Sequence, residues 1–226
     1  MPMIKIDALQ ALYNFYDDFT DRLNLACGPG CLTCCSVNVS ITSLETACLR
    51  QHPALADTRL WKRINAAHRR SHFIPSLTTN RIAHHCLHRQ EPPKEKGMHA
   101  PGACPLLGSS GLCLVYENRP FSCRAMSSID TCQVDGEAII PPFLMTINLA
   151  IYQLIEHLDA EGSSGNMLDM LAGDGQNRIP NTPFPGFLLT DEEKPPFQRF
   201  LQSLKKYAVN GGYLADFFPP QTFILN

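Results

Sequence analysis

The stretch CGPGCLTCC, residues 27–35, decides how this chain folds, because it places four cysteines within nine residues. Glycine and proline between the cysteines break a helix and let the backbone turn tightly. Thiolates are soft ligands that suit zinc and iron–sulfur clusters, and four of them packed together without a cation would repel one another. Short loops also keep the ligands close together before a metal arrives. The stretch therefore predicts a metal-binding loop.

Cys34 and Cys35 are adjacent in this loop, and neighbouring side chains diverge along an extended backbone. Two such residues serve one metal ion poorly, whereas they can serve two neighbouring metal centres well. The pair therefore favours two sites, or one polynuclear cluster, over a single mononuclear site.

A second cysteine-rich stretch, CPLLGSSGLCLVYENRPFSCRAM, occupies residues 104–126, and cysteines recur from its start at steps of about nine residues. The alternative for all these thiols is a role as buried small apolar groups, which their clustering disfavours. For Cys48 and Cys86, which stand singly in helical segments, that structural role is favoured. The predicted metal ligands are Cys27, Cys31, Cys34, Cys35, Cys104, Cys113, Cys123 and Cys132.

Two arginines, Arg119 and Arg124, flank Cys123. Guanidinium groups beside a thiolate-bound metal would offset the negative charge of the site, and Pro120 restricts the backbone after Arg119. We expect both arginines to donate hydrogen bonds to cysteine sulfurs or adjacent carbonyls around the metal. The alternative is that one of them binds an anionic ligand in a cleft beside the metal.

Composition places the chain among ordinary globular proteins: it has 226 residues, of which 44% are apolar, and a formal net charge of −2. This charge gives no global attraction to nucleic acid or anionic lipid. No apolar run approaches the roughly 20 residues that cross a bilayer, and the N-terminus lacks the features of a signal peptide. We therefore expect a soluble cytoplasmic protein without membrane or nucleic-acid partners. In that reducing compartment, dense cysteine is more typical of metal sites than of disulfides.

The predicted fold is mainly α, with helices packed around irregular cysteine-rich loops and little or no sheet. Apolar residues recur at helical spacing in several segments, and Thr42 and Glu45 have the spacing of a capping box. The only period-2 pattern covers residues 36–41. The predicted helices span residues 6–25, 42–53, 54–71, 142–160 and 196–209, and residues 89–111 and 161–166 are predicted to be irregular.

The motif C-x3-C-x2-C-C followed by C-P-x7-C-x2-Y-x2-R-P-x2-C-R resembles the cysteine-cluster (YkgJ-like) family, described as a zinc- or iron-chelating domain. The resemblance covers about residues 25–135 and implies metal binding, as zinc or as an iron–sulfur (4Fe–4S) cluster, without a settled activity. It predicts a metal-binding domain at residues 1–135 and a helical elaboration at 136–226, packed as one unit. Besides the eight cysteines, the matching residues are Pro105, Tyr116, Arg119, Pro120 and Arg124.

Two other motifs point to different enzymes but fit poorly. Cys27, Cys31 and Cys34 share the C-x3-C-x2-C spacing of radical S-adenosylmethionine enzymes, which need a large βα barrel that this strand-poor pattern does not predict. Residues 167–175 are similar to the glycine-rich turn of methyltransferases, but too little chain follows to complete a nucleotide-binding sheet. A helix followed by a Gly-Asp-Gly loop is the favoured interpretation of this segment.

Histidines offer further metal ligands, although a solvated polar role is favoured for them. His84, His85 and His88 surround Cys86, and His99 lies five residues before Cys104. His68 and His72 are one helical turn apart, and the basic residues beside them predict an exposed face. An acidic partner or RNA is the alternative for these residues, but a solvated face without a partner is favoured. The basic residues are Lys62, Arg63, Arg69 and Arg70.

Three roles remain open for a protein of this kind. In the first, the metal is structural zinc. In the second, an iron–sulfur cluster handles electrons or supports a protein modification such as lysine methylation. In the third, the thiolates bind metal in order to pass it on, as in a metal-handling protein. The second role draws on the flagellin lysine-N-methylases, which carry a related cysteine cluster. Metal ions are the expected partners, with a protein partner possible in the third role. The sequence identifies no catalytic residue.

Overall fold

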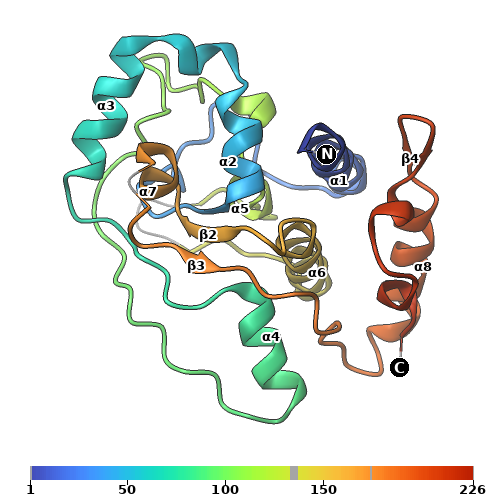
Figure 1. Ribbon diagram of the computed structural model, residues 1–226. Helices are drawn as coiled ribbons and strands as arrows, with labels where there is room; N and C mark the ends of the chain where they lie inside the picture. The colour runs from blue at the N-terminus through green and yellow to red at the C-terminus, as the bar shows by residue number, and fades with distance from the viewer. Residues whose placement is uncertain (1, 133–136, 174, 226) are drawn as a thin grey trace.

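Figure 1 shows a computed structural model, which describes residues 2–132, 137–173 and 175–225. Helices dominate, and the described strands are short and belong to two small antiparallel sheets. The chain is therefore mainly α with little sheet, as predicted. No helix in these described ranges is long and apolar enough to cross a membrane.

The larger core forms where helices from opposite ends of the chain meet. Phe15 of the first helix packs edge-on against Phe200, with ring centroids 5.2 Å apart. Tyr16 donates a hydrogen bond of 2.7 Å to the side-chain oxygen of Asn148. Apolar stripes at helical spacing bury these faces against one another. The helices are α1 (Pro2–Thr20), α6 (Pro142–Leu158) and α8 (Lys194–Lys205).

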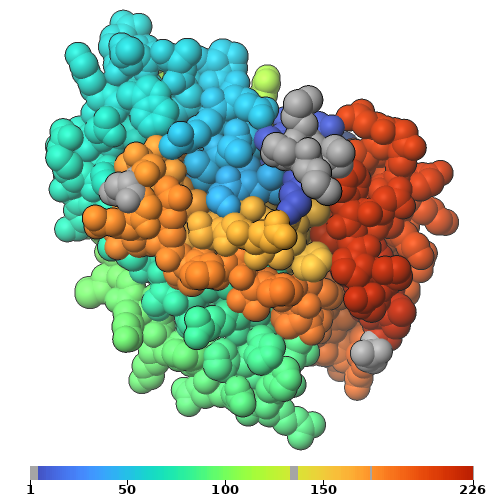
Figure 2. Space-filling model, viewed as in Figure 1, coloured from blue at the N-terminus to red at the C-terminus, as the bar shows by residue number. Residues whose placement is uncertain are grey.

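A smaller core joins shorter helices on the other side of the molecule, where α7 lies against α3 (Figure 1). Its buried side chains include Ile64, Leu168 and Leu171. In the space-filling view, residues that follow position 160 fill the surface between the blue-to-cyan N-terminal helices and the green α4 (Figure 2). The helices of this core are α2 (Ser43–Arg50), α3 (Thr58–His68) and α7 (Met167–Ala172). Of the other short helices, α4 (Thr79–Leu87) packs on α6, and α5 (Phe121–Ala125) places Phe121 and Ala125 in the larger core.

A three-stranded antiparallel sheet links the two cores. Its strands are β1 (Ser40–Thr42), β2 (Ser163–Asn166) and β3 (Ile179–Pro180), and Ile41 is paired with Gly165. The prediction of an irregular loop at 161–166 is therefore wrong. This segment is polar and lacks a period-2 pattern, and its strand is stabilised by a partner more than 120 residues away in sequence. The second sheet is a hairpin of β4 (Ala208–Val209) and β5 (Gly212–Tyr213).

Glu45 makes the densest set of buried contacts in the first half of the chain. Its side chain closes the predicted capping box by accepting from the Thr42 N–H at 2.8 Å. It also accepts from the Tyr13 hydroxyl at 2.9 Å and from the Phe121 N–H at 2.8 Å. Burial raises the pKa of this carboxyl, while its hydrogen-bond donors lower it. One carboxylate thus joins α1, the start of α2 and the start of α5.

Helix positions agree with the predictions, although the ends differ. The first helix ends at Thr20 rather than near residue 25, and the segment after residue 53 forms a short 3₁₀ turn, η1 (Pro53–Ala56), before α3. Helix ends are set by local caps, such as the Asp57 side chain that accepts from the N–H of Arg59. Both cores contain residues from either side of position 135. The division into a metal-binding domain at 1–135 and a helical elaboration at 136–226 stays a prediction.

The Glu45 contacts predict a large loss of stability in Glu45→Ala. Removal of the carboxylate leaves three buried donors without an acceptor, and we expect the free energy of unfolding to fall by about 3 kcal/mol. Urea denaturation followed by circular dichroism measures this loss. Glu192→Ala, at an exposed position, is the control and should change stability by no more than about 0.5 kcal/mol. Equal effects of the two substitutions would contradict the role of Glu45.

Candidate metal centre

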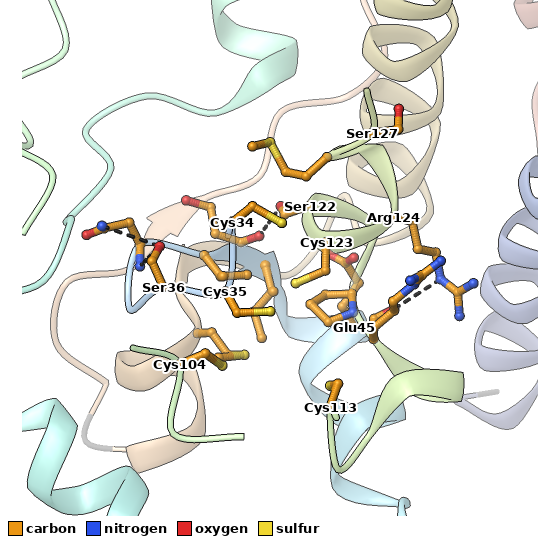
Figure 3. Close-up of a pocket in the computed structure, with 18 of the residues that line it drawn as sticks. Cys34, Cys35, Ser36, Glu45, Cys104, Cys113, Ser122, Cys123, Arg124 and Ser127 are labelled. Carbon is orange, nitrogen blue, oxygen red and sulfur yellow. Dashed lines mark hydrogen bonds between the residues drawn. The ribbon is translucent and has the colours of Figure 1, made fainter. Parts of the chain in front are cut away.

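A cleft of about 990 Å³ opens between the cysteine-rich segments, and seven of the eight predicted ligands line it. Figure 3 shows that cysteines from three separate segments lie around this space, with Cys34 and Cys35 from one, Cys104 and Cys113 from another and Cys123 from α5. Cys132 is not part of the lining. The lining cysteines are Cys27, Cys31, Cys34, Cys35, Cys104, Cys113 and Cys123.

Backbone turns shape the first cysteine loop, residues 27–35. A hydrogen bond just before Cys27 joins this loop to the chain that follows the second cysteine-rich stretch. The Cys31 N–H donates to the Gly28 carbonyl at 3.0 Å, and the Cys35 N–H donates to the Leu32 carbonyl at 2.9 Å. The Ala26 N–H donates to the Ser128 carbonyl at 2.8 Å, and the Ser128 N–H donates to the Cys27 sulfur. The predicted turns are thus formed, and Ser128 fixes Cys27 although no sequence motif singled it out.

The second segment places its first two cysteines side by side through a hairpin. The Leu114 N–H donates to the Leu106 carbonyl at 2.9 Å, and Gly111 adopts a φ of +78° at the tip, where glycine carries no steric cost. The Cys104 N–H donates to the Cys35 carbonyl at 3.0 Å, so the hairpin is docked directly onto the first loop. Residues far apart in sequence are therefore joined backbone to backbone at the cysteines themselves.

The sulfur of Cys104 accepts backbone hydrogen bonds from the N–H groups of Leu106 and Leu107. Hydrogen bonds of this kind favour the thiolate, although burial is the larger effect and raises the pKa of Cys104 to about 11. Arg63 of α3 donates to the Leu107 carbonyl and lies near enough for its charge to favour the Cys104 thiolate. Arg63 was predicted only as part of an exposed basic face, because a contact made across 44 residues leaves no local signal.

Four cysteines, termed here the inner group, lie close to one another: Cys35, Cys104, Cys113 and Cys123. A hydrogen bond from Cys34 lowers the pKa of Cys35, while burial and the charges of the other three inner thiols oppose this. Burial raises the pKa of Cys123, and the charges of Cys104, Cys113 and Cys34 add to the rise. These effects show that the thiols share one region of the cleft, where a cation would reduce the repulsion between their thiolates.

The remaining four cysteines, termed the outer group, are Cys27, Cys31, Cys34 and Cys132. Burial raises the pKa of Cys27, and the charges of the other three outer thiols raise it further. Cys31 and Cys34 are exposed, in contrast to every member of the inner group. Cys34 lies between the two groups, because its thiol donates a hydrogen bond to Cys35 and its charge also raises the pKa of Cys123.

Across the described ranges, no three or more histidine, cysteine, aspartate or glutamate side chains already surround a common point as the ligands of a bound ion do. The donor chemistry nevertheless fits zinc or iron, since eight soft thiols gather in two groups and hydrogen bonds reach the sulfurs of Cys104 and Cys27. Ligation by these eight residues stays a prediction.

Arg124 points away from the cysteines toward α1 (Figure 3), and its contacts are structural. Its guanidinium pairs with Asp17, donates to the carbonyls of Glu117 and Arg119, and lies over the ring of Tyr13 at 4.4 Å. It therefore fixes the turn that precedes Cys123. A direct role at the metal stays a prediction.

Arg119 lines the cleft and lies over the ring of Tyr116, with its central carbon 4.1 Å from the ring centroid. Its Nε is buried and has no hydrogen-bond partner among the described residues. Its charge partly offsets the raised pKa values of Cys34 and Cys123, so the guanidinium lies near one thiol of each group. This position agrees with the predicted role of offsetting charge at the metal.

The remaining cysteines and histidines considered as ligands lie in different places: in the core, on the surface or in the cleft. Cys48 is buried in the larger core, as predicted, whereas Cys86 is exposed on α4. His84 and His88 are exposed and stacked on each other with centroids 4.2 Å apart, which agrees with a solvated stretch. His99 lines the cleft and packs on Phe73.

The prediction of an exposed, unpartnered role for His68 and His72 is wrong. Both rings contact the carboxylate of Asp169, which is completely buried in α7. The helix predicted around Asp169 is confirmed and ends at Gly173 in the left-handed conformation, while Asp174 of the predicted Gly-Asp-Gly loop lies outside the described residues. No local pattern predicts this contact, because α3 and α7 are about 100 residues apart in the chain.

The contacts of Arg124 predict that Arg124→Gln destabilises the fold and weakens metal retention. The buried guanidinium has a carboxylate partner that is partly exposed, so we expect a loss of about 2 kcal/mol in the free energy of unfolding. Urea denaturation measures the loss, and metal analysis of the same sample measures retention. Arg69→Gln, at an exposed position, should alter neither quantity. If both substitutions behave alike, the structural role of Arg124 is wrong.

Comparison with known proteins places this arrangement in a family. The CxxCxxCC family, described as "Putative zinc- or iron-chelating domain", matches residues 26–138. No curated protein and no solved structure matches the chain. The matched segment is half of the chain and contains both cysteine stretches, from Cys27 to Cys132. The chain therefore belongs to the CxxCxxCC family of zinc- or iron-chelating domains.

Proposed function

We propose that this chain is a cytoplasmic metal-binding protein with two thiolate centres, an inner one held by the inner group and an outer one held by the outer group. The observation that supports the proposal is that the thiols act on one another in two sets: Cys31, Cys34 and Cys132 raise the pKa of Cys27, and Cys104, Cys113 and Cys123 raise that of Cys35. Each set has four sulfurs, the number that closes a tetrahedral zinc site or ligates one iron–sulfur cluster.

The inner centre has the character of a structural site. Its four cysteines come from three segments that are otherwise poor in regular structure, and a metal would join them. The backbone bond from Cys104 to Cys35 and the hairpin at 104–114 set the ligands near one another before binding. Zinc bound there would cross-link the three segments. An iron–sulfur cluster would cross-link them and would also accept and donate electrons.

The outer centre has the character of an exchangeable site. Cys31 and Cys34 are exposed, and the loop that carries them is short and rich in glycine. Thiolate exchange depends on access to the sulfur, so the outer group would lose or transfer metal faster than the inner group. This contrast supports metal handling as a second function, in which a protein partner would meet the exposed face. Residues 136–226 would then serve as the helical support of the metal-binding part.

Replacement of the adjacent cysteines tests the division into two centres. In Cys34→Ser we expect loss of the outer metal, and in Cys35→Ser loss of the inner metal, so that each variant retains the metal of the other thiolate centre. Metal analysis after anaerobic purification gives the stoichiometry and the identity of the metal. Cys48→Ser and Cys86→Ser are the controls and should retain all of it.

The outcome that contradicts this division is loss of the entire metal content in either single variant. That result would indicate one polynuclear centre. Unchanged metal in both variants would contradict ligation by these cysteines altogether.

Chelator challenge tests the contrast in exchange. Excess chelator should remove metal in two phases, a fast phase from the outer group and a slow phase that coincides with loss of helical signal and a lower thermal transition, because metal in a structural site is part of the folding free energy. Circular dichroism and metal release are followed on the same sample. The fast phase should be missing in Cys34→Ser. Release in a single phase with no change in helical signal would contradict the structural role of the inner metal.

A further inference from the structure

A separate cluster lies between α3 and α7, which pack side by side in Figure 1. His68 Nε2 lies 3.0 Å from Oδ1 of Asp169, and His72 Nε2 lies 3.1 Å from both carboxylate oxygens of the same residue. The Asp169 side chain is completely buried, and those of His72 and His68 are 7% and 22% exposed. None of the three lines the cysteine cleft.

Hydrogen-bond geometry fixes the proton of His72. Its Nδ1 lies 2.8 Å from the Arg70 carbonyl, which can only accept, so Nδ1 carries a proton. In a neutral ring, Nε2 then presents a lone pair to two carboxylate oxygens, which also present lone pairs. Contacts of 3.1 Å between such atoms are repulsive unless a proton or a metal ion lies between them.

Metal ligation explains the whole arrangement. A metal-bound histidine commonly donates its other ring N–H to a backbone carbonyl, as His72 does to Arg70. Its Nε2 is equally distant from the two oxygens of Asp169, which suits a ligand that shares a metal ion with the carboxylate and also suits a bifurcated hydrogen bond from a protonated ring. The second imidazole approaches the same carboxylate, so two nitrogens and a carboxylate converge. Protonated rings account for the same distances, and cobalt binding separates the two arrangements.

The supporting residues hold the three side chains in place. Asn166, which caps the start of α7, donates to the carbonyl of Phe73 at 2.8 Å, and the Phe73 N–H donates to Asn38 at 3.1 Å. These bonds fix the residue after His72 against α7. Arg50 donates to the Leu171 carbonyl at 2.6 Å and holds the other end of the helix.

We propose that His68, His72 and Asp169 form a binding site for a divalent transition-metal ion, distinct from the cysteine centres. Two histidines and one carboxylate are a ligand set of catalytic zinc and of non-haem ferrous iron, with positions left for water or substrate. The three side chains now touch directly and do not surround an ion, so an ion enters by displacing the protons that lie between the ring nitrogens and the carboxylate and by moving the rings slightly apart. The exposed edge of His68 is the route of entry.

Cobalt(II) substitution separates this site from the thiolates, because cobalt bound to sulfur gives intense near-ultraviolet charge-transfer bands, whereas cobalt bound by nitrogen and oxygen gives only weak visible bands. The test uses the full chain without a histidine tag. In His68→Gln, we expect one metal equivalent fewer per chain, or at least tenfold weaker binding of the last cobalt equivalent, with the thiolate bands unchanged. His72→Gln should behave in the same way, and His88→Gln, on exposed α4, should behave like the natural chain.

Circular dichroism checks that the variants are folded, and His68→Gln is the safest of them because His68 is partly exposed. The proposal is overturned if His68→Gln and His72→Gln bind the same number of cobalt ions as His88→Gln with the same affinity. If cobalt added to the natural chain gives the nitrogen–oxygen bands without the thiolate bands, the cysteine centres are contradicted and this site is supported. The two proposals therefore fail separately.

Discussion

The buried carboxylate of Glu45 is the contact on which the rest of this structure depends. It accepts from Tyr13 of α1, from the backbone of Thr42 where β1 meets α2, and from the backbone of Phe121 where α5 begins. Helix α5 has no side-chain cap of its own, so Glu45 supplies the acceptor for its first turn. Cys123 lies two residues further on, and residues 36–39 lead back from β1 to Cys35. The Glu45 carboxylate therefore connects both cysteine segments to the helical core.

The cysteine segments depend on this frame because they contain little regular structure of their own. They are joined to each other by backbone bonds at Cys35, Val37 and Ala26, which lie at or beside the cysteines. Backbone bonds at these points hold the loops in register even though few apolar side chains are available there. The helical core fixes where the loops begin and end, and the thiols lie where those loops converge. Chelation in this family thus rests on a scaffold that is mostly outside the chelating residues.

Local sequence signals predicted much of this arrangement. The capping box at Thr42 and the apolar stripe of α6 each depend on residues a few positions apart, and both are present in the structure. The predicted divergence of Cys34 from Cys35 is not seen in this way, because their side chains hydrogen-bond to each other. Contacts between distant segments were not predictable in the same way. Strand β2 is polar and forms only because β1 pairs with it, and Asp169 gains its histidine partners from a helix about 100 residues earlier. Arg63 at the Cys104 hairpin belongs to the same class, since its basic neighbours predicted only a solvated face.

The order of the elements along the chain has a consequence for synthesis in the cell. The larger core needs α6 and α8, yet all eight clustered cysteines precede both helices. During translation, the thiols leave the ribosome on the order of ten seconds before the last core helix does. In that interval α1 can pack against α2 and α5 but lacks α8, so the core that supports the cysteine segments is incomplete. Metal insertion and protection from oxidation are therefore tasks for the completed chain or for factors that accompany the nascent one.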